Sequence, residues 1–164
     1  QYRREVTEYI ENNCRVKKES GQDADVSTQA MASYHDDRNG TLRGSSVVRI
    51  FDIDGLKVVH MGDQGCMPGE NVLETIADAD VMMIPVGGFY TIDAQGAKAI
   101  LDRVHPKCVI PMHYKTAHCA YPIAGVEPFL RLMGAENVQP VDELDVMPDH
   151  VPQGVVVMKA KAEY

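Results

Sequence analysis

The stretch VVRIFDIDGLKVVHMGD, residues 47–63, predicts two adjacent β-strands that end at an acidic residue. Two alternating apolar runs meet at Asp54-Gly55, and an Asp-Gly pair between such runs is the strongest short-range signal for a β-hairpin. The second run stops at Gly62-Asp63, a turn pair three residues after His60. The stretch therefore predicts a hairpin and a carboxylate at the edge of a sheet.

The periodicity of apolar residues predicts further elements on both sides of this hairpin. After it, continuous apolar runs that stop at Pro or Gly alternate with helical patterns, as buried strands and their crossover helices do. Thr91 or Asp93 can cap one of these helices. The expected helices cover residues 1–13, 69–79, 91–104 and 125–134, and the expected strands cover residues 26–34, 47–54, 56–62, 80–88, 107–114 and 155–160.

The order of these elements predicts an α/β protein. Hairpin-like β-structure comes first and alternating strands and helices follow, which indicates helices layered on a mixed sheet. Three predicted strands end in polar residues: His35 with Asp36, Asp63, and His113 with Tyr114. Because sites in α/β folds gather at strand ends, we expect these side chains to meet in one cleft.

Length and composition restrict the class of protein. The 164 residues suffice for one domain, and we expect residues 1–164 to form a single one. The net charge of −8 argues against nucleic acid as a partner, because phosphate binding requires a basic face. The absence of any run of about 18 apolar residues argues against a membrane span. Four unevenly spaced cysteines favour reduced thiols and a cytoplasmic protein.

Histidine and aspartate at neighbouring strand ends suit zinc, manganese or iron. A bound metal lowers the pKa of water toward neutrality, so such a cluster can support hydrolysis. Judged one at a time, each histidine is explained at least as well by a hydrogen-bonded core or surface position. We interpret His60 as a support behind Asp63 or a packing residue, and Cys66 as a small packing residue. The remaining histidines are interpreted as structural or solvated: His105, His118 and His150.

Four motifs together resemble those of the metallo-β-lactamase superfamily, in particular its small metal-dependent hydrolases related to the lactonase and ribonuclease-processing branches. The motifs are YHDD (34–37), GLKVVHMGDQG (55–65), DVMMIPVGGFYTIDAQGA (80–97) and VIPMHY (109–114). The resemblance runs from about residue 26 to about residue 135. It implies the C-terminal part of a four-layer αβ/βα sandwich with mixed sheets and a site at the edge between the sheets.

The resemblance also implies the metal ligands. His35 corresponds to the histidine that binds one metal, Asp63 to the aspartate that bridges both metals, and His113 to the histidine that binds the second. Zinc is the implied cofactor, with two ions in a complete member and manganese or iron as alternatives. Asp63 thereby takes part in catalysis, and Asp36 and Tyr114 would line the pocket for a small-molecule substrate, together with the Gly87-Gly88 loop.

One motif of the superfamily has no counterpart in this sequence. The His-x-His-x-Asp-His loop near the N-terminus, which supplies more than half of the family's usual ligands, does not occur. We therefore expect an N-terminally incomplete domain whose three remaining ligands hold metal weakly. A bare sheet face should then associate with a second copy or with the missing segment.

The function that the sequence favours is hydrolysis of an ester, lactone or phosphodiester-type bond by a metal-activated water. Activity is expected of the complete parent protein more than of this fragment. The alternative is a non-catalytic remnant of the fold that acts as a binding or assembly module, and metal content would separate the two. A receiver-like or nucleotide-binding domain is disfavoured, because no standard glycine-rich phosphate loop occurs.

Overall fold

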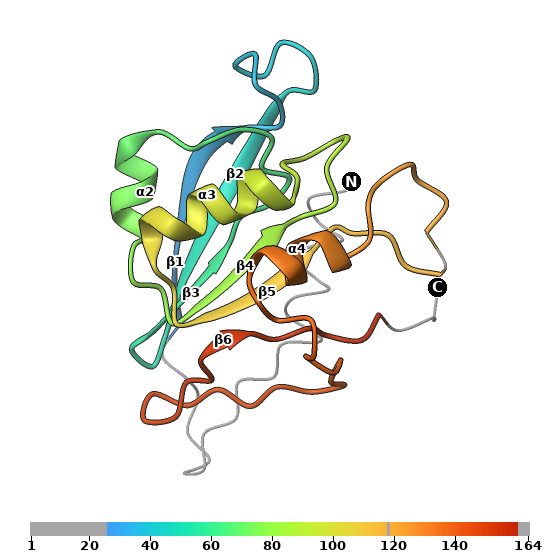
Figure 1. Ribbon diagram of the computed structural model, residues 1–164. Helices are drawn as coiled ribbons and strands as arrows, with labels where there is room; N and C mark the ends of the chain where they lie inside the picture. Colours follow the sequence, from blue (N-terminus) through green and yellow to red (C-terminus); the bar gives the residue numbers. More distant parts are fainter. Residues whose placement is uncertain (1–25, 118, 161–164) are drawn as a thin grey trace.

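The predicted hairpin forms the second and third strands of a mixed sheet (Figure 1). The computed structural model describes residues 26–117 and 119–160. Strand β2 (Ser45–Ile53) pairs antiparallel with β3 (Leu56–His60), and Ile53 lies opposite Leu56. The φ angles of Asp54 and Gly55 are 52° and 85°, the left-handed backbone that both central residues of a type I′ turn require. The prediction of an Asp-Gly hairpin is confirmed.

The sheet has six strands in the order β1-β2-β3-β4-β5-β6. Strand β1 (Val26–Tyr34) is antiparallel to β2, whereas β3, β4 (Val81–Pro85), β5 (Cys108–Met112) and β6 (Gly154–Val155) are parallel to one another. Since β1 and β3 both run against β2, strands β1, β3, β4 and β5 end on the same side. We call this side of the sheet the carboxyl edge.

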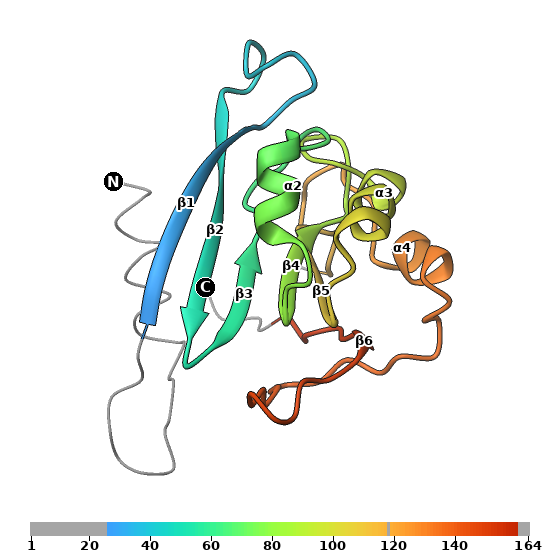
Figure 2. The ribbon, with the colours of Figure 1, turned by 90° about the vertical axis from the view of Figure 1, so that its left-hand side faces the viewer.

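The helices connect the parallel strands. Helix α2 (Glu70–Ile76) joins β3 to β4, and α3 (Ala94–Val104) joins β4 to β5. Right-handed crossovers that proceed in one direction along a sheet lie on one face of it, and Figures 1 and 2 show both helices there. Asp93 caps α3 by accepting a 2.8 Å hydrogen bond from a first-turn N–H. Helix α4 (Glu127–Leu132) packs beside α3.

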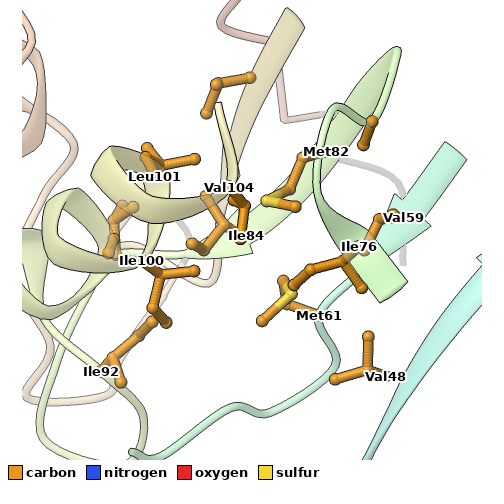
Figure 3. Packing of buried hydrophobic residues seen from close by; sticks show 14 of the residues in the cluster. Val48, Val59, Met61, Ile76, Met82, Ile84, Ile92, Ile100, Leu101 and Val104 are labelled. Atoms are coloured by element: carbon orange, nitrogen blue, oxygen red, sulfur yellow. The ribbon is translucent and has the colours of Figure 1, made fainter. Parts of the chain in front are cut away.

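The hydrophobic core lies between the sheet and these helices (Figure 3). Strand residues such as Val59 and Ile84 are fully buried against helical residues such as Ile76 and Ile100. Burial of each such side chain stabilises the folded chain by about 1.5–3 kcal/mol relative to leaving the side chain in water. The core thereby fixes strands β2 to β5 and the starting points of the loops at the carboxyl edge. The labelled members of the cluster are Val48, Val59, Met61, Ile76, Met82, Ile84, Ile92, Ile100, Leu101 and Val104.

Expectations for the two ends of the chain have different outcomes. The strand expected over residues 155–160 is wrong beyond Val155, because β6 ends there. The Val156 N–H still donates to Val109 O of β5 at 2.9 Å, and after it the chain pairs with Val141, whose N–H donates to Val157 O at 2.9 Å. The helix expected over residues 1–13 lies outside the described residues. The other strands and helices occur close to their predicted ranges.

Candidate metal site

The three predicted metal ligands follow strands that end at the carboxyl edge. His35 comes directly after β1, Asp63 follows β3 by three residues, and His113 comes directly after β5. The Gly87-Gly88 turn follows β4 at the same edge. The expectation that these segments share one side of the sheet is confirmed, although no local sequence pattern joins them.

Backbone hydrogen bonds tie the loops at this edge to one another. Gly65 N–H donates to Tyr34 O at 2.9 Å, which links the loop after β3 to the end of β1. Ile92 N–H donates to Gln64 O at 2.8 Å, which links the loop after β4 to the loop after β3. Val86 N–H donates to Met112 O at 3.1 Å and holds the ends of β4 and β5 together. The edge is therefore a connected framework.

A glycine lies directly against the backbone of each predicted histidine ligand. A Cβ atom on Gly65 would overlap the carbonyl group of His35, and a Cβ on Gly87 would overlap the carbonyl oxygen of His113. Neither glycine has a φ angle in the left-handed region, so space and not conformation requires them. The positions of both histidines thus depend on glycines elsewhere in the chain.

His35 carries an unsatisfied nitrogen. Its Nε2 atom is buried and has no hydrogen-bond partner, while its backbone N–H donates to Gly44 O at 3.1 Å. Buried polar atoms nearly always have a partner, and an exception calls for an unseen ion, a water or a functional role. A neutral imidazole nitrogen is a ligand that zinc, iron and manganese accept. The chemistry of this atom fits a metal ion.

Asp63 is held by His60 and faces solvent. The Gly62 N–H donates to His60 Nδ1 at 3.0 Å, so His60 fixes the turn that carries Asp63. The Asp63 carboxylate is exposed and accepts no hydrogen bond from a described residue, which leaves both oxygens free for a cation. Burial lowers the pKa of His60, Arg49 lowers it further, and the Asp63 carboxylate opposes them. The supporting position predicted for His60 agrees with this contact.

His113 ends β5 in an unusual backbone conformation. Its φ angle is 52°, in the left-handed region that residues with a side chain seldom adopt. Such conformations cost about 1–3 kcal/mol and occur mostly at functional sites. The His113 side chain is exposed. The backbone of this loop is thus held in place by its neighbours while the imidazole remains accessible.

His35, Asp63 and His113 lie at the same edge but do not form a complete set of metal ligands. Across residues 26–117 and 119–160, no three side chains of His, Cys, Asp or Glu stand close enough together to hold a metal ion. His35 Nε2 is enclosed, whereas Asp63 and His113 are exposed and belong to separate loops. The expected meeting of side chains in one cleft is therefore not found, and the ligand roles of these residues stay predictions.

Asp36, which was expected to line the pocket, organises the loop between β1 and β2. Its buried carboxylate accepts hydrogen bonds from the backbone N–H groups of Arg38, Gly40, Leu42 and Arg43, at 2.6–3.0 Å. Burial acts to raise the pKa of Asp36, but these four donors together hold that pKa below its ordinary value. Both oxygens accept hydrogen bonds within the β1–β2 loop, and the pocket-lining role of Asp36 stays a prediction.

Tyr114 and Cys66 are likewise occupied by structural contacts. The Tyr114 hydroxyl donates to Met158 O at 3.3 Å, and burial raises its pKa, with Glu127 adding to the effect. This bond ties the loop after β5 to the C-terminal segment. Burial also raises the pKa of the Cys66 thiol, as do Asp36 and Asp37, so the thiol stays protonated. Cys66 is half-buried, and its assignment as a small packing residue stays a prediction.

Gln64 is a buried polar residue that the sequence did not single out. Its side chain is fully buried, and Nε2 donates to Ser33 Oγ and to Cys66 O, both at 2.8 Å. Its Oε1 atom has no partner. Its position between Asp63 and Gly65 was the only sequence signal available. Gln64 braces the loop after β3 against β1 and adds a second unsatisfied atom at the carboxyl edge.

Comparison with known protein families shows to which superfamily the chain belongs. The sequence profile described as "Beta-lactamase superfamily domain" matches residues 7–113, a span that includes His35, Asp63 and His113. The chain belongs to the β-lactamase superfamily. Like its metallo-β-lactamase fold relatives, this superfamily member has a mixed sheet with helices packed on it.

Relatives of this chain match about half of its length. A UPF0173 metal-dependent hydrolase of Thermoplasma acidophilum is 31% identical over 86 residues, which are 52% of this chain and 38% of the relative. Another, from Archaeoglobus fulgidus, is 39% identical over 67 residues, which are 41% of this chain and 29% of the relative. The superfamily chain thus spans less than half of the length of these curated relatives.

Solved structures agree with the fold. A Thermotoga maritima protein assigned to the Zn-dependent hydrolases of the metallo-β-lactamase superfamily is 33% identical, with a TM-score of 0.68 over 81% of this chain and 64% of that one. The metallo-β-lactamase fold protein YhfI of Bacillus subtilis is 15% identical, with a TM-score of 0.51 over 85% of this chain and 48% of that one, and shows the fold alone. No helix within the described part of the superfamily chain is long and apolar enough to cross a membrane.

Proposed function

We propose that this chain carries part of the active site of a metal-dependent hydrolase, in which His35, Asp63 and His113 bind metal at the carboxyl edge. The observation that carries the proposal is the buried, unpartnered Nε2 of His35 at the edge where Asp63 and His113 also lie. The metal-dependent hydrolases among the relatives support the same reaction class.

Each residue of the proposed site has a chemical task. His35 and His113 would each offer a neutral imidazole nitrogen, and Asp63 would offer a carboxylate that offsets the charge of the metal. A bound metal would supply Lewis-acid activation of a water molecule for hydrolysis. His60 accepts the Gly62 N–H and so holds Asp63 in position.

The metal and the bond that is cleaved are finer parts of the same proposal. We assign zinc, with two ions in the complete protein, because imidazole and carboxylate groups are ligands that zinc prefers. Manganese and iron also accept these ligands and are the alternatives. The substrate bond is an ester, lactone or phosphodiester. All three are hydrolysed by an activated water that attacks a carbonyl carbon or a phosphorus atom.

Metal content of purified variants tests this proposal. We expect His35→Ala, Asp63→Ala and His113→Ala each to lose bound zinc after equilibration with a small excess of the ion, as measured by mass spectrometry of the metal. His105→Asn is the matched control, because His105 lies at the opposite end of the sheet, after α3, with φ 48°, a conformation that asparagine tolerates. Unchanged zinc in all three variants, on folded protein, would refute the ligand assignment.

A binding or assembly module without catalysis is the second candidate. Two observations favour it: Asp63 and His113 face solvent, and the described residues contain no three-ligand group. The discriminating measurement compares this chain with a form extended upstream in the parent gene. Zinc uptake and hydrolysis of a generic phosphodiester and a generic lactone by the extended form alone would assign catalysis to the whole protein. Their absence from both forms would favour the module.

Self-association, or association with a further segment of the same protein, belongs to this proposal. Strand β1 is the first strand of the sheet, and all but two of its nine residues are exposed. Exposed strand edges commonly pair with another chain. The molecular mass in solution, measured by light scattering, should exceed that of one chain and should fall when Gln29→Pro interrupts β1.

A further inference from the structure

Three aromatic rings and one guanidinium group gather at the carboxyl edge. Tyr90 is central: its ring lies 4.7 Å from that of Phe89, 5.9 Å from that of Tyr121, and 5.8 Å from the Arg43 guanidinium carbon. Phe89 and Tyr121 are 62% and 64% exposed. We call these four residues the aromatic platform. Exposed rings that touch each other present a large surface for binding.

The loop that carries Phe89 and Tyr90 is closed and strained. Gly87 and Asp93 form an isolated bridge, and Gly88 N–H donates to Ile92 O at 3.2 Å. Phe89 has a φ angle of 64°, which is an outlier for a bulky residue. The ring at this position is exposed. Strained backbone of this kind persists where the surroundings enforce it, typically at ligand-binding positions.

Backbone hydrogen bonds connect the platform to the candidate metal site. The loop with Tyr121 is tied to the His113 side of the edge, because Ala124 N–H donates to Gly87 O at 2.8 Å and Gly87 lies against His113. The loop with Tyr90 is tied to the Asp63 side through the 2.8 Å bond from Ile92 N–H to Gln64 O. The platform is thus anchored to both loops that carry exposed candidate ligands.

Arg43 gives the aromatic platform a positive charge. It is exposed, and no carboxylate of a described residue pairs with its guanidinium group, in a chain with 24 acidic and 16 basic residues. Asp36 positions it, because the Asp36 carboxylate accepts the Arg43 backbone N–H at 2.6 Å. An arginine left free of carboxylates and placed over a ring can bind an anion with its remaining donors.

We propose that the aromatic platform binds a small substrate that carries a planar ring beside a phosphate or carboxylate group. The ring would stack on the exposed faces of Phe89 and Tyr121, and the anion would pair with Arg43. The substrate class rests on the proposed hydrolase function, since the platform adjoins the candidate metal site. The binding itself does not, because no platform residue is a metal ligand. The net charge of −8 disfavours a nucleic acid strand in this position.

Binding to the metal-free 164-residue chain tests the proposal without reference to hydrolysis. The probes are phenyl phosphate, which has both features, methyl phosphate, which lacks the ring, and benzyl alcohol, which lacks the charge. Dissociation constants come from chemical-shift titrations. Since stacking on an aromatic side chain and a charge-assisted hydrogen bond are each worth about tenfold in affinity, phenyl phosphate should bind at least tenfold more tightly than either other probe.

Variants of the platform separate the contribution of ring stacking from that of the pairing between the anion and Arg43. Tyr121→Leu removes one of the two exposed stacking faces and should reduce the preference for phenyl over methyl phosphate about tenfold. Tyr90→Leu removes the ring against which both faces pack and should reduce the same preference. Arg43→Gln should weaken phenyl phosphate about tenfold and leave benzyl alcohol unchanged. Arg103→Gln is the control, because Arg103 pairs with Glu70 at the other end of α3.

Three results would overturn the proposal. The first is equal affinity for phenyl and methyl phosphate, and the second is affinities that the platform variants do not change. The third is a single-stranded oligonucleotide that binds a hundredfold more tightly than phenyl phosphate, which would identify a strand as the occupant. All three results are measured without metal, so loss of metal binding in Asp63→Ala does not change them. This proposal can therefore be refuted while the proposed hydrolase function stands, and the reverse.

Discussion

Replacing Gly65 by alanine should damage both stability and metal binding, although Gly65 has no functional group. The added methyl would overlap the carbonyl carbon and oxygen of His35 and the nitrogen of Asp36, which are all backbone atoms. Backbone cannot move aside as the end of a flexible side chain can. Either His35 or the loop after β3 must therefore shift.

The structure sets the size of this effect. Forcing extra volume into a packed position costs about 1–3 kcal/mol. The shift would also lengthen the 2.9 Å hydrogen bond from Gly65 N–H to Tyr34 O, a loss of about 0.5–1.5 kcal/mol. The free energy of unfolding should fall by about 2–4 kcal/mol, a substantial part of the roughly 5–15 kcal/mol of a typical domain. The melting temperature should fall by about 5–15 °C.

Urea unfolding followed by circular dichroism measures the loss, and zinc content measures its consequence for His35. Gly69→Ala is the matched control: Gly69 has a φ angle of −65°, and its added methyl would meet only the end of the Asn71 side chain, at 3.1 Å. The control should lose about 1 kcal/mol or less. If Gly65→Ala unfolds at the same urea concentration as Gly69→Ala, the close approach of Gly65 to His35 is not the constraint described above.

Further predictions concern the same edge. Gly87→Ala should reduce zinc content by displacing His113, and normal content in a folded variant would contradict this. Asp63→Ala should reduce zinc content far more than His60→Ala, because only Asp63 offers the metal a charged ligand; equal content would count against it. Zinc binding should weaken as the pH falls, because protons compete with the metal for its ligand atoms, and titrations of zinc at several pH values would show this. Burial, aided by Arg49, lowers the pKa of His60 in the folded chain, so the unfolded chain binds the extra proton as the pH falls through about 6.5. The free energy of unfolding should therefore decrease with falling pH in that range, by at most about 1.4 kcal/mol per pH unit from this group, and less steeply in His60→Gln.

Local sequence determined most of the secondary structure. Asp54-Gly55 specified its hairpin because few residues other than Gly, Asn and Asp accept two consecutive left-handed conformations. Asp93 specified the start of α3 because its carboxylate satisfies an N–H of the first turn. The strand predicted over residues 155–160 was wrong beyond Val155 because local sequence does not choose the partner of a strand. An apolar run such as residues 155–160 can pair with any available strand, and here Val141 replaces β5 as its partner.

The candidate site was determined only in part by sequence. Alternating strands and helices were enough to predict that His35, Asp63 and His113 follow strands, since such sheets place their polar residues at strand ends. Residue type alone could not predict the contacts of Asp36, because a carboxylate looks the same in sequence whether it faces a substrate or four backbone N–H groups. Tertiary structure decided that β1, β3, β4 and β5 end at one edge, that glycines press against both histidines, and that Arg43 meets Tyr90. These contacts join residues from separate loops, and their geometry depends on how the core packs the sheet and helices between them. Local preference acts over a few neighbouring residues, so it cannot specify such contacts.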